Sequence, residues 1–289
     1  MDDRRDADTA AILKGAETID LQEEGSPGVL LLHGFGDTPQ TVSLLARRLA
    51  KAGYSVLAPL LPGHGRTMEA FTKSRADDWV DAARGSLLEM RARHAAVSIV
   101  GLSMGGALGV VMAAEVQDIS SLILIAPYVG MPLQLRVAAR THWLWGRTAG
   151  EINARNPRSI RDPIEREKNI AYGAITGRAL FELSRIVKRA RKALTDVTAP
   201  TLIVQSREDP RISPVVAEFA LSELGAREKK LIWTEGAGHI ITVDYGRERV
   251  FSDVEKWLQM YGGPGATAAA RQADRLSTLA ARSDPGRTQ

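Results

Sequence analysis

The sequence contains no cysteine, which excludes disulfide bonds, thiolate metal sites and cysteine nucleophiles. Aromatic residues are also scarce, at 5% of 289 residues. No apolar run approaches the roughly 20 residues that cross a bilayer. The charged start MDDRRDADTAAILKGAE has no apolar stretch of the kind found in a signal peptide. We therefore expect a soluble, cytoplasmic protein without stable membrane insertion.

The remaining composition is that of an ordinary globular protein, with 44% hydrophobic and 25% charged residues. The formal net charge of +4 is unevenly distributed, because Arg136–Lys192 contains 14 Arg and Lys against 5 Asp and Glu, or about +9. Two interpretations stay open for this stretch: a solvated helical surface, or weak contact with an anionic lipid interface. No nucleic-acid-binding motif accompanies the charge, so we expect no nucleic-acid partner.

Short apolar runs alternate with longer amphipathic stretches along the chain. Because the short runs are continuously apolar, they are typical of strands buried on both faces. Regular alternation of this kind predicts an α/β fold with a mostly parallel central sheet flanked by helices. The predicted strands are Val29–Leu32, Val56–Ala58, Val97–Val100, Ser121–Ala126, Thr201–Gln205 and Lys230–Thr234, and the predicted helices are Gln40–Ala52, Asp77–His94, Met104–Glu115 and Pro214–Leu224.

The alternation stops between about residues 128 and 195, where the sequence is Arg-rich and contains no convincing strand. We interpret residues 128–195, called the cap segment below, as a short helical cap inserted after the sixth strand. The predicted organisation is an N-terminal extension (1–26), an α/β core (27–127 and 196–261), the cap segment and a polar C-terminal tail (262–289).

Ser103 lies in the motif GLSMG, between a predicted strand and a predicted helix. A sharp turn there strains the backbone, and Gly101 and Gly105 remove the Cβ atoms that would clash. The turn also places the serine at a helix N-terminus, where free N–H groups stabilise an oxyanion. The motif favours a nucleophile, with an ordinary glycine-rich turn as the alternative.

A serine nucleophile needs a general base, and the chain has five histidines. His239 is the best candidate, because it lies in GAGHIITVD directly after the last predicted strand, at the edge where open α/β folds bind ligands. Of the others, we expect His64 to structure a loop, His94 to be solvated and His142 to lie in the cap segment.

The acid that orients the histidine is expected just after the preceding strand. Asp209, in QSREDPRISP, occupies that position, and Glu208 is its neighbour and main competitor. Asp196 precedes the strand and falls at the wrong end of the sheet, whereas Asp244 is expected to make local hydrogen bonds. The resulting order of serine, acid and histidine is that of α/β-hydrolases.

An oxyanion hole requires two N–H donors near the serine oxygen. One predicted donor is the amide of Met104, which follows the nucleophile. The other is the amide of Phe35, in the segment HGFG that follows the first predicted strand.

Taken together, these residues resemble the α/β-hydrolase superfamily across roughly residues 27–260, and within it the small bacterial carboxylesterases and monoacylglycerol lipases. The resemblance implies a catalytic triad of Ser103, Asp209 and His239, oxyanion donors at Phe35 and Met104, and no cofactor or metal. It also implies a helical cap over an acyl pocket. The segments that resemble this group are LLLHGFGDTP, APLLPGHG, DDWVDA, GLSMGGAL, APTLIVQSREDPRISP and GAGHIITVD.

The function implied by the resemblance is hydrolysis of short-to-medium-chain carboxylic esters through an acyl-enzyme. Monoacylglycerol lipase activity is the alternative, followed by C–C bond hydrolysis or perhydrolysis, which would use the same triad. A non-catalytic small-molecule receptor is disfavoured because all three triad positions are filled. The expected partner is a small-molecule ester or monoacylglycerol, and both monomer and homodimer stay open. Apolar cap residues either line an acyl pocket or pack the cap onto the core: Leu144, Ile164, Ile170, Leu180, Phe181 and Ile186.

Overall fold

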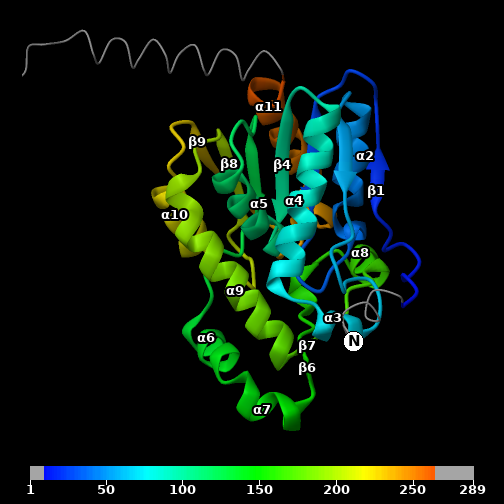
Figure 1. The fold of residues 1–289 in the computed structure, drawn as a ribbon, viewed down its shortest axis with the longest axis vertical. Coiled ribbons are helices and arrows are strands. Elements are labelled where there is room, and N and C mark those ends of the chain that lie inside the picture. The colour runs from blue at the N-terminus through cyan, green and yellow to red at the C-terminus, as the bar shows by residue number, and fades with distance from the viewer. Residues whose placement is uncertain (1–9, 264–289) are drawn as a thin grey trace, which may run out of the picture.

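The computed structural model describes residues 10–263, which form a seven-stranded sheet flanked by helices (Figure 1). The sheet order is β1-β3-β2-β4-β5-β8-β9, with β1 antiparallel to β3 and the other neighbours parallel. Its strands are β1 (Ile19–Leu21), β2 (Gly28–Leu32), β3 (Ser55–Ala58), β4 (Val97–Leu102), β5 (Leu122–Ile125), β8 (Thr201–Ser206) and β9 (Lys229–Thr234).

The apolar runs of the sequence form the interior of this sheet. Every residue of β2, β3, β4, β5 and β8 is buried, as expected for strands covered on both faces. All six predicted strands are present. The short strand β1 was not predicted, because three residues, IDL, are too few to show a period. Ile19 and Leu21 are half-buried and Asp20 is exposed. The predicted core boundary at residue 27 therefore leaves out a strand of the main sheet.

Helices cover both faces of the sheet (Figure 1). Helices α4 and α5 pack together over β2 and β4, while α2 and α11 pack together on the opposite face. Neither α3 nor α11 was predicted, although the buried residues of α11 recur at helical spacing. The core helices are α2 (Ser43–Lys51), α3 (Met68–Lys73), α4 (Ala76–Arg93), α5 (Met104–Glu115), α10 (Pro214–Glu223) and α11 (Arg247–Tyr261), and the 3-10 helices are η1 (Pro39–Val42), η2 (Pro157–Ser159), η3 (Leu194–Asp196) and η4 (Ile241–Val243).

Strand register aligns the loops that leave the carboxyl edge of the sheet. Leu32, the last residue of β2, pairs with Gly101 in β4. Ser206 of β8 pairs with Thr234 of β9, and both are the last residues of their strands. Because parallel strands end at the same edge, the loops after β2, β4, β8 and β9 all begin at that edge, with β5 between the first pair and the second.

The cap segment lies between β5 and η3 and packs mainly on helix α5. Helix α9 lies along α5, and α6 and α7 pack against α9 at the end far from the sheet (Figure 1). The prediction that the cap segment follows a sixth strand is wrong, because it follows β5. Among the described residues, five strands, β1 to β5, precede the cap segment. Its elements are α6 (Leu133–Arg140), α7 (His142–Ala149), β6 (Glu151–Asn153), η2, α8 (Pro163–Lys168), β7 (Ala174–Thr176) and α9 (Gly177–Ala193).

Two details of the cap segment differ from the sequence interpretation. Strands β6 and β7 form a small antiparallel sheet of three-residue strands, too short to give a sequence period. Leu180 and Ile186 on α9 are buried, whereas Leu144 and Ile164 are 59% and 64% exposed. The two exposed side chains neither line an interior pocket nor pack the cap segment onto the core.

The predicted C-terminal tail, residues 262–289, lies outside the described residues from 264 onward, as do residues 1–9 of the N-terminal extension. Within the part of the chain that is described, no helix combines the length and the apolar character needed to cross a membrane.

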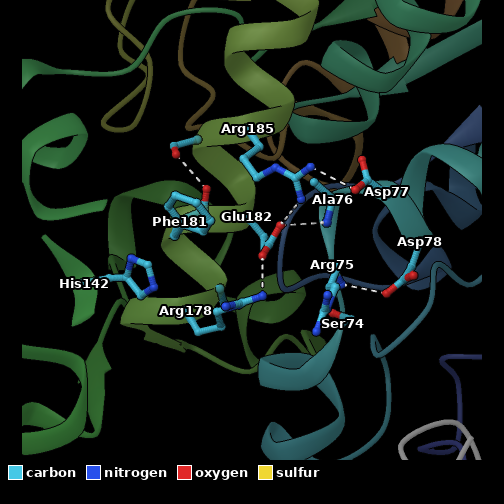
Figure 2. A network of polar contacts seen from close by, with 12 residues as sticks. Ser74, Arg75, Ala76, Asp77, Asp78, His142, Arg178, Phe181, Glu182 and Arg185 are labelled. Atoms are coloured by element: carbon cyan, nitrogen blue, oxygen red, sulfur yellow. Dashed lines mark hydrogen bonds and ion pairs between the residues drawn. The ribbon is translucent and has the colours of Figure 1, made fainter. Parts of the chain in front are cut away.

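A buried carboxylate joins the cap segment to the core (Figure 2). Glu182 on α9 is 1% exposed, and its Oε2 accepts a hydrogen bond from the Ala76 amide at 3.2 Å. That amide is at the first turn of α4, where intrahelical partners are missing. Arg178 and Arg185 pair with the same carboxylate at 3.0 and 2.9 Å, and Arg185 also reaches Asp77 at 2.9 Å. The network therefore ties α9 to the N-terminus of α4.

We predict that Glu182→Gln lowers the free energy of unfolding by about 1–3 kcal/mol, because a neutral amide makes weaker hydrogen bonds to the two arginines and the helix terminus. Urea denaturation measures the change. The exposed pair of Asp81 with Arg84, 2.7 Å apart, provides a matched control. Asp81→Asn should change stability by less than about 0.5 kcal/mol, and equal losses in the two variants would contradict the buried-carboxylate account.

Candidate active site

Ser103 lies on the turn between β4 and α5 in a strained backbone conformation, with φ 56° and ψ −114°. Such a conformation costs a non-glycine residue about 1–3 kcal/mol and persists only where neighbouring structure enforces it. The Ser103 amide donates to the Ile125 carbonyl at 2.9 Å, and its carbonyl accepts from the Tyr128 amide at 3.0 Å. Contacts to β5 and the residues after it therefore hold the turn.

The two flanking glycines are required by close backbone packing. A Cβ at Gly101 would lie 2.3 Å from the Gly105 carbonyl oxygen, and one at Gly105 would lie 2.1 Å from the Leu32 carbonyl oxygen. No side chain fits at either position, so the sharp turn needs glycine there. The GxSxG spacing thus follows directly from the packing of α5 against β2 and β4.

The structure brings Ser103, His239 and Asp209 into one hydrogen-bonded chain. His239 Nε2 lies 2.9 Å from Ser103 Oγ, and His239 Nδ1 lies 2.8 Å from Asp209 Oδ2. A carboxylate only accepts hydrogen bonds, so the proton is on Nδ1 and Nε2 is free to accept from the serine hydroxyl. All three side chains lie in loops at the carboxyl edge of the sheet.

Four donors surround the carboxylate of Asp209. Its Oδ1 accepts from the amides of Arg211 and Ile212 at 2.7 and 3.0 Å, and its Oδ2 accepts from His239 and from Gln205 Nε2 at 3.0 Å. Burial raises the pKa of Asp209, but the charge and hydrogen bond of His239 and the two amides together hold it below its usual value. The group is therefore an anion suited to orienting an imidazole.

The competing residue Glu208 is occupied elsewhere. Its Oε1 accepts from the Gly236 amide at 3.0 Å, and its carboxylate pairs with Arg161. Asp196 lies in η3, before β8, at the opposite end of that strand from Asp209. Asp209 is thus the acid that the structure places against His239.

Of the two predicted oxyanion donors, Met104 directly follows Ser103, and Phe35 lies in the loop that passes beside it. Met104 is the first residue of α5, where the amide has no intrahelical acceptor. Phe35 follows Gly34, where an added Cβ would lie 3.5 Å from Ser103 Cβ. The loop after β2 therefore passes directly beside the serine.

Two buried histidines support this loop. His33 Nε2 accepts from the Leu61 amide at 3.1 Å, so Nδ1 carries the proton and donates to the Gly34 carbonyl at 2.9 Å. Burial lowers the pKa of His33 to about 4, so it is neutral at pH 7. His64 packs edge-on against it at 5.1 Å between ring centroids, and burial lowers its pKa well below the usual value.

The other two histidines lie away from the serine. His94 is buried and follows the last turn of α4, with its ring nitrogens 2.9 Å from the Ser26 carbonyl and 3.0 Å from Gln22 Oε1. The prediction that His94 is solvated is therefore wrong, because the segment between β1 and β2, which contains Gln22 and Ser26, covers the ring. His142 stacks on Phe181 within the cap segment, with ring centroids 4.5 Å apart.

Among the described residues, no cluster of three or more His, Asp and Glu side chains is placed to hold a metal.

The chain is similar in sequence to a known protein family and to characterised enzymes. The family model described as serine aminopeptidase, S33, matches residues 26–245. A thermostable monoacylglycerol lipase from Bacillus sp. (strain H-257) is 31% identical over 252 residues, covering 86% of this chain and 96% of the relative. A carboxylesterase from Bacillus subtilis (strain 168) is 25% identical over 237 residues, covering 81% and 93% of the two chains.

Solved structures have the same fold. A metagenome-derived lipolytic enzyme superposes with a TM-score of 0.79 at 30% identity, covering 87% of this chain and all of the other. A monoacylglycerol lipase from Paleococcus ferrophilus superposes with a TM-score of 0.70 at 21% identity, covering 83% of this chain and 97% of the other. The fold is that of the α/β-hydrolases.

One titratable residue of this region was missed by sequence reasoning. Asp37 is buried, and its Oδ2 lies 2.9 Å from the point where a Gly34 Cβ would be. Burial raises the pKa of Asp37 from its usual 3.8 to about 6, while the charges of His239 and Arg211 lower it. The signal that could have identified Asp37 from the sequence is its position in HGFGD, directly after the predicted oxyanion loop.

We predict that Asp37→Asn stabilises the protein increasingly as pH rises. The folded chain holds the Asp37 proton more tightly than the unfolded chain does. Wild type therefore loses stability as the pH rises from 3.8, the unfolded pKa, to about 6, the folded pKa. Asparagine has no such proton. From about pH 4 to about pH 8, the unfolding free energy of the variant minus that of wild type should rise by about 2–3 kcal/mol. Urea titrations measure it, and a difference independent of pH would contradict the assignment.

Proposed function

This chain belongs to the hydrolase family described as serine aminopeptidase, S33, and we propose that it is a serine hydrolase of carboxylic esters. The observation that most supports the proposal is the chain of hydrogen bonds from Ser103 Oγ to His239 Nε2, at 2.9 Å, and from His239 Nδ1 to Asp209 Oδ2, at 2.8 Å. Nucleophile, base and orienting acid are within hydrogen-bond reach before any substrate binds.

In the first half of the reaction, Ser103 Oγ attacks the ester carbonyl carbon while its proton passes to His239 Nε2. The Asp209 anion stabilises the imidazolium that forms. The carbonyl oxygen becomes an oxyanion, which the amides of Met104 and Phe35 and the N-terminus of α5 stabilise. His239 then protonates the departing alcohol, leaving the acyl group on Ser103.

In the second half of the reaction, water is the nucleophile and Ser103 Oγ is the leaving group. His239 takes a proton from a water molecule, which attacks the acyl carbonyl and forms a second oxyanion at the same two amides. As the bond to Ser103 breaks, His239 returns the proton to Oγ and the carboxylic acid leaves. Each oxyanion donor of this kind supplies about 10²–10³ in rate.

The substrate class proposed is short-to-medium-chain esters, with monoacylglycerols as the second candidate. The second is favoured by one observation, the 31% identity to a monoacylglycerol lipase that extends over 96% of that enzyme. The carboxylesterase relative, at 25% identity, favours the first. Both reactions use the same acyl-enzyme, so the difference lies in the alcohol that leaves.

The outer face of the cap segment is proposed to contact anionic lipid. Five large apolar side chains on α6 and α7 are 39–65% exposed: Leu133, Leu135, Val137, Trp143 and Leu144. Exposed Arg136 and Arg140 lie among them on α6. Apolar side chains flanked by cations suit an interface of acyl chains and anionic headgroups. Figure 1 shows α6 and α7 at the end of the molecule away from the sheet.

We predict that Ser103→Ala lowers kcat for p-nitrophenyl esters by about 10⁴-fold or more, because both half-reactions need the nucleophile. A chain-length series run beside monoacylglycerols and an aminoacyl p-nitroanilide measures the substrate class. Because the variant removes only Oγ, comparing its unfolding transition with that of wild type shows whether it is folded. Full activity of the variant, or anilide cleavage in preference to every ester, would contradict the proposal.

We predict that the enzyme binds vesicles of phosphatidylcholine containing phosphatidylglycerol more tightly than phosphatidylcholine alone, and that salt weakens this preference. Trp143→Ser should lower the partition coefficient by about 10- to 100-fold, since an apolar side chain contributes about 1.5–3 kcal/mol on burial. Val215→Ser is the matched control, because Val215 is equally exposed, at 65%, but lies on α10. Cosedimentation measures binding, and equal partition into both vesicle types would contradict it.

A further inference from the structure

Asp244 follows η4, five residues after His239, and its carboxylate is completely buried. Four backbone amides donate to it. Oδ2 accepts from Gly238 at 2.6 Å and from Arg161 at 2.9 Å, and Oδ1 accepts from Asp162 and Tyr245, both at 2.9 Å. Gly238 and Tyr245 belong to the loop that holds the histidine, whereas Arg161 and Asp162 belong to the cap segment.

The backbone of His239 depends on the same stretch of the cap segment. The amides of His239 and Ile240 both donate to the Ser159 carbonyl at 2.9 Å. At Gly238 the packing is so close that an added Cβ would lie 2.0 Å from the Arg158 carbonyl oxygen. Three consecutive amides, at 238, 239 and 240, are thus bound by Asp244 and Ser159 after β9 has ended.

The loop after β8, which carries Asp209, is joined to the same stretch of the cap segment. The Arg211 amide donates to Asp209, while its guanidinium donates from Nε to Ser159 Oγ at 2.9 Å and from Nη2 to the Ala154 carbonyl. Residues 154–162 of the cap segment therefore contact the loops of both Asp209 and His239. These polar contacts hold the two loops beyond the point where the pairing of β8 with β9 ends.

We propose that Asp244 is a positioning residue for His239, which fixes the histidine loop (residues 236–245) against residues 159–162 of the cap segment. Asp244 touches neither the substrate nor the reacting atoms. It acts by satisfying amides of both segments with one carboxylate, so that the imidazole stays between Ser103 and Asp209. This inference rests on the proposed serine chemistry and adds a residue that the triad does not include.

The carboxylate is chemically suited to this role because it has acceptor sites on both oxygens and no donor. Asparagine has the same shape, but its amide group would direct N–H bonds at two of the four donors. Those amides would lose their acceptor, and the loop would shift to relieve the repulsion. A displacement of about 1 Å at a catalytic group can cost about 10²-fold in rate.

The test compares Asp244→Asn with Glu182→Gln, which also removes the charge of a buried carboxylate joining the cap segment to the core. Two rates are measured: kcat for a p-nitrophenyl ester and the rate of Ser103 phosphonylation by a p-nitrophenyl phosphonate. Asp244→Asn should lower both by about 10- to 100-fold and change KM by less than about 3-fold. Glu182→Gln should keep both rates within about 2-fold, whatever its stability.

Unchanged phosphonylation in folded Asp244→Asn would overturn the proposal, as would an equal loss in Glu182→Gln. If Asp244→Asn does not fold, hydrogen exchange of the wild-type protein gives the answer. Phosphonylation of Ser103 should then slow amide exchange in residues 159–162 together with residues 236–245, and no slowing in 159–162 would overturn the proposal. Phosphonylation without hydrolysis of any ester would instead contradict the proposed function alone.

Discussion

The sharp turn at Ser103 is the constraint on which the rest of the site depends. Its positive φ is tolerated because Gly101 and Gly105 let β2, β4 and α5 approach to distances at which no Cβ fits. The same approach places the serine at the start of α5 and beside the loop that follows β2. A single packing arrangement therefore holds the buried Ser103 hydroxyl within hydrogen-bond reach of His239 and places the Met104 amide and the loop after β2 beside it.

The cap segment has two parts with different relations to this turn. Residues 154–172 contact the loops around the site: Asp244 and Ser159 join them to the His239 loop, and the Tyr172 amide donates to the Gly36 carbonyl at 3.2 Å, beside the predicted oxyanion loop. Helices α6 and α7 instead pack on the far end of α9 and expose apolar side chains. The first part therefore contacts the loops of the proposed triad, whereas the second forms the surface proposed to contact lipid.

Much of this arrangement was predictable from sequence, because it is encoded locally. Continuous apolar runs predict the buried strands. Ser103, Asp209 and His239 each follow one of those strands, so the sequence could predict that the three residues lie close together at one edge of the sheet. The contacts that were missed are those between distant segments. Asp244 appeared to be a local hydrogen-bond partner because its acceptance of amides at 161 and 162 depends on how the cap segment folds back. The burial of His94 and the raised pKa of Asp37 likewise depend on surroundings that no local pattern records.

The central claim is that Ser103 forms a covalent acyl intermediate, and the most direct measurement is the mass of that residue during turnover. Acid quenching of the enzyme milliseconds after mixing with a p-nitrophenyl ester, followed by peptide mass spectrometry, locates any bound acyl group. The account predicts one acyl group, on the peptide that contains GLSMG, and its disappearance as substrate is exhausted. Turnover with no acylated peptide, or acylation at a different residue, would contradict it.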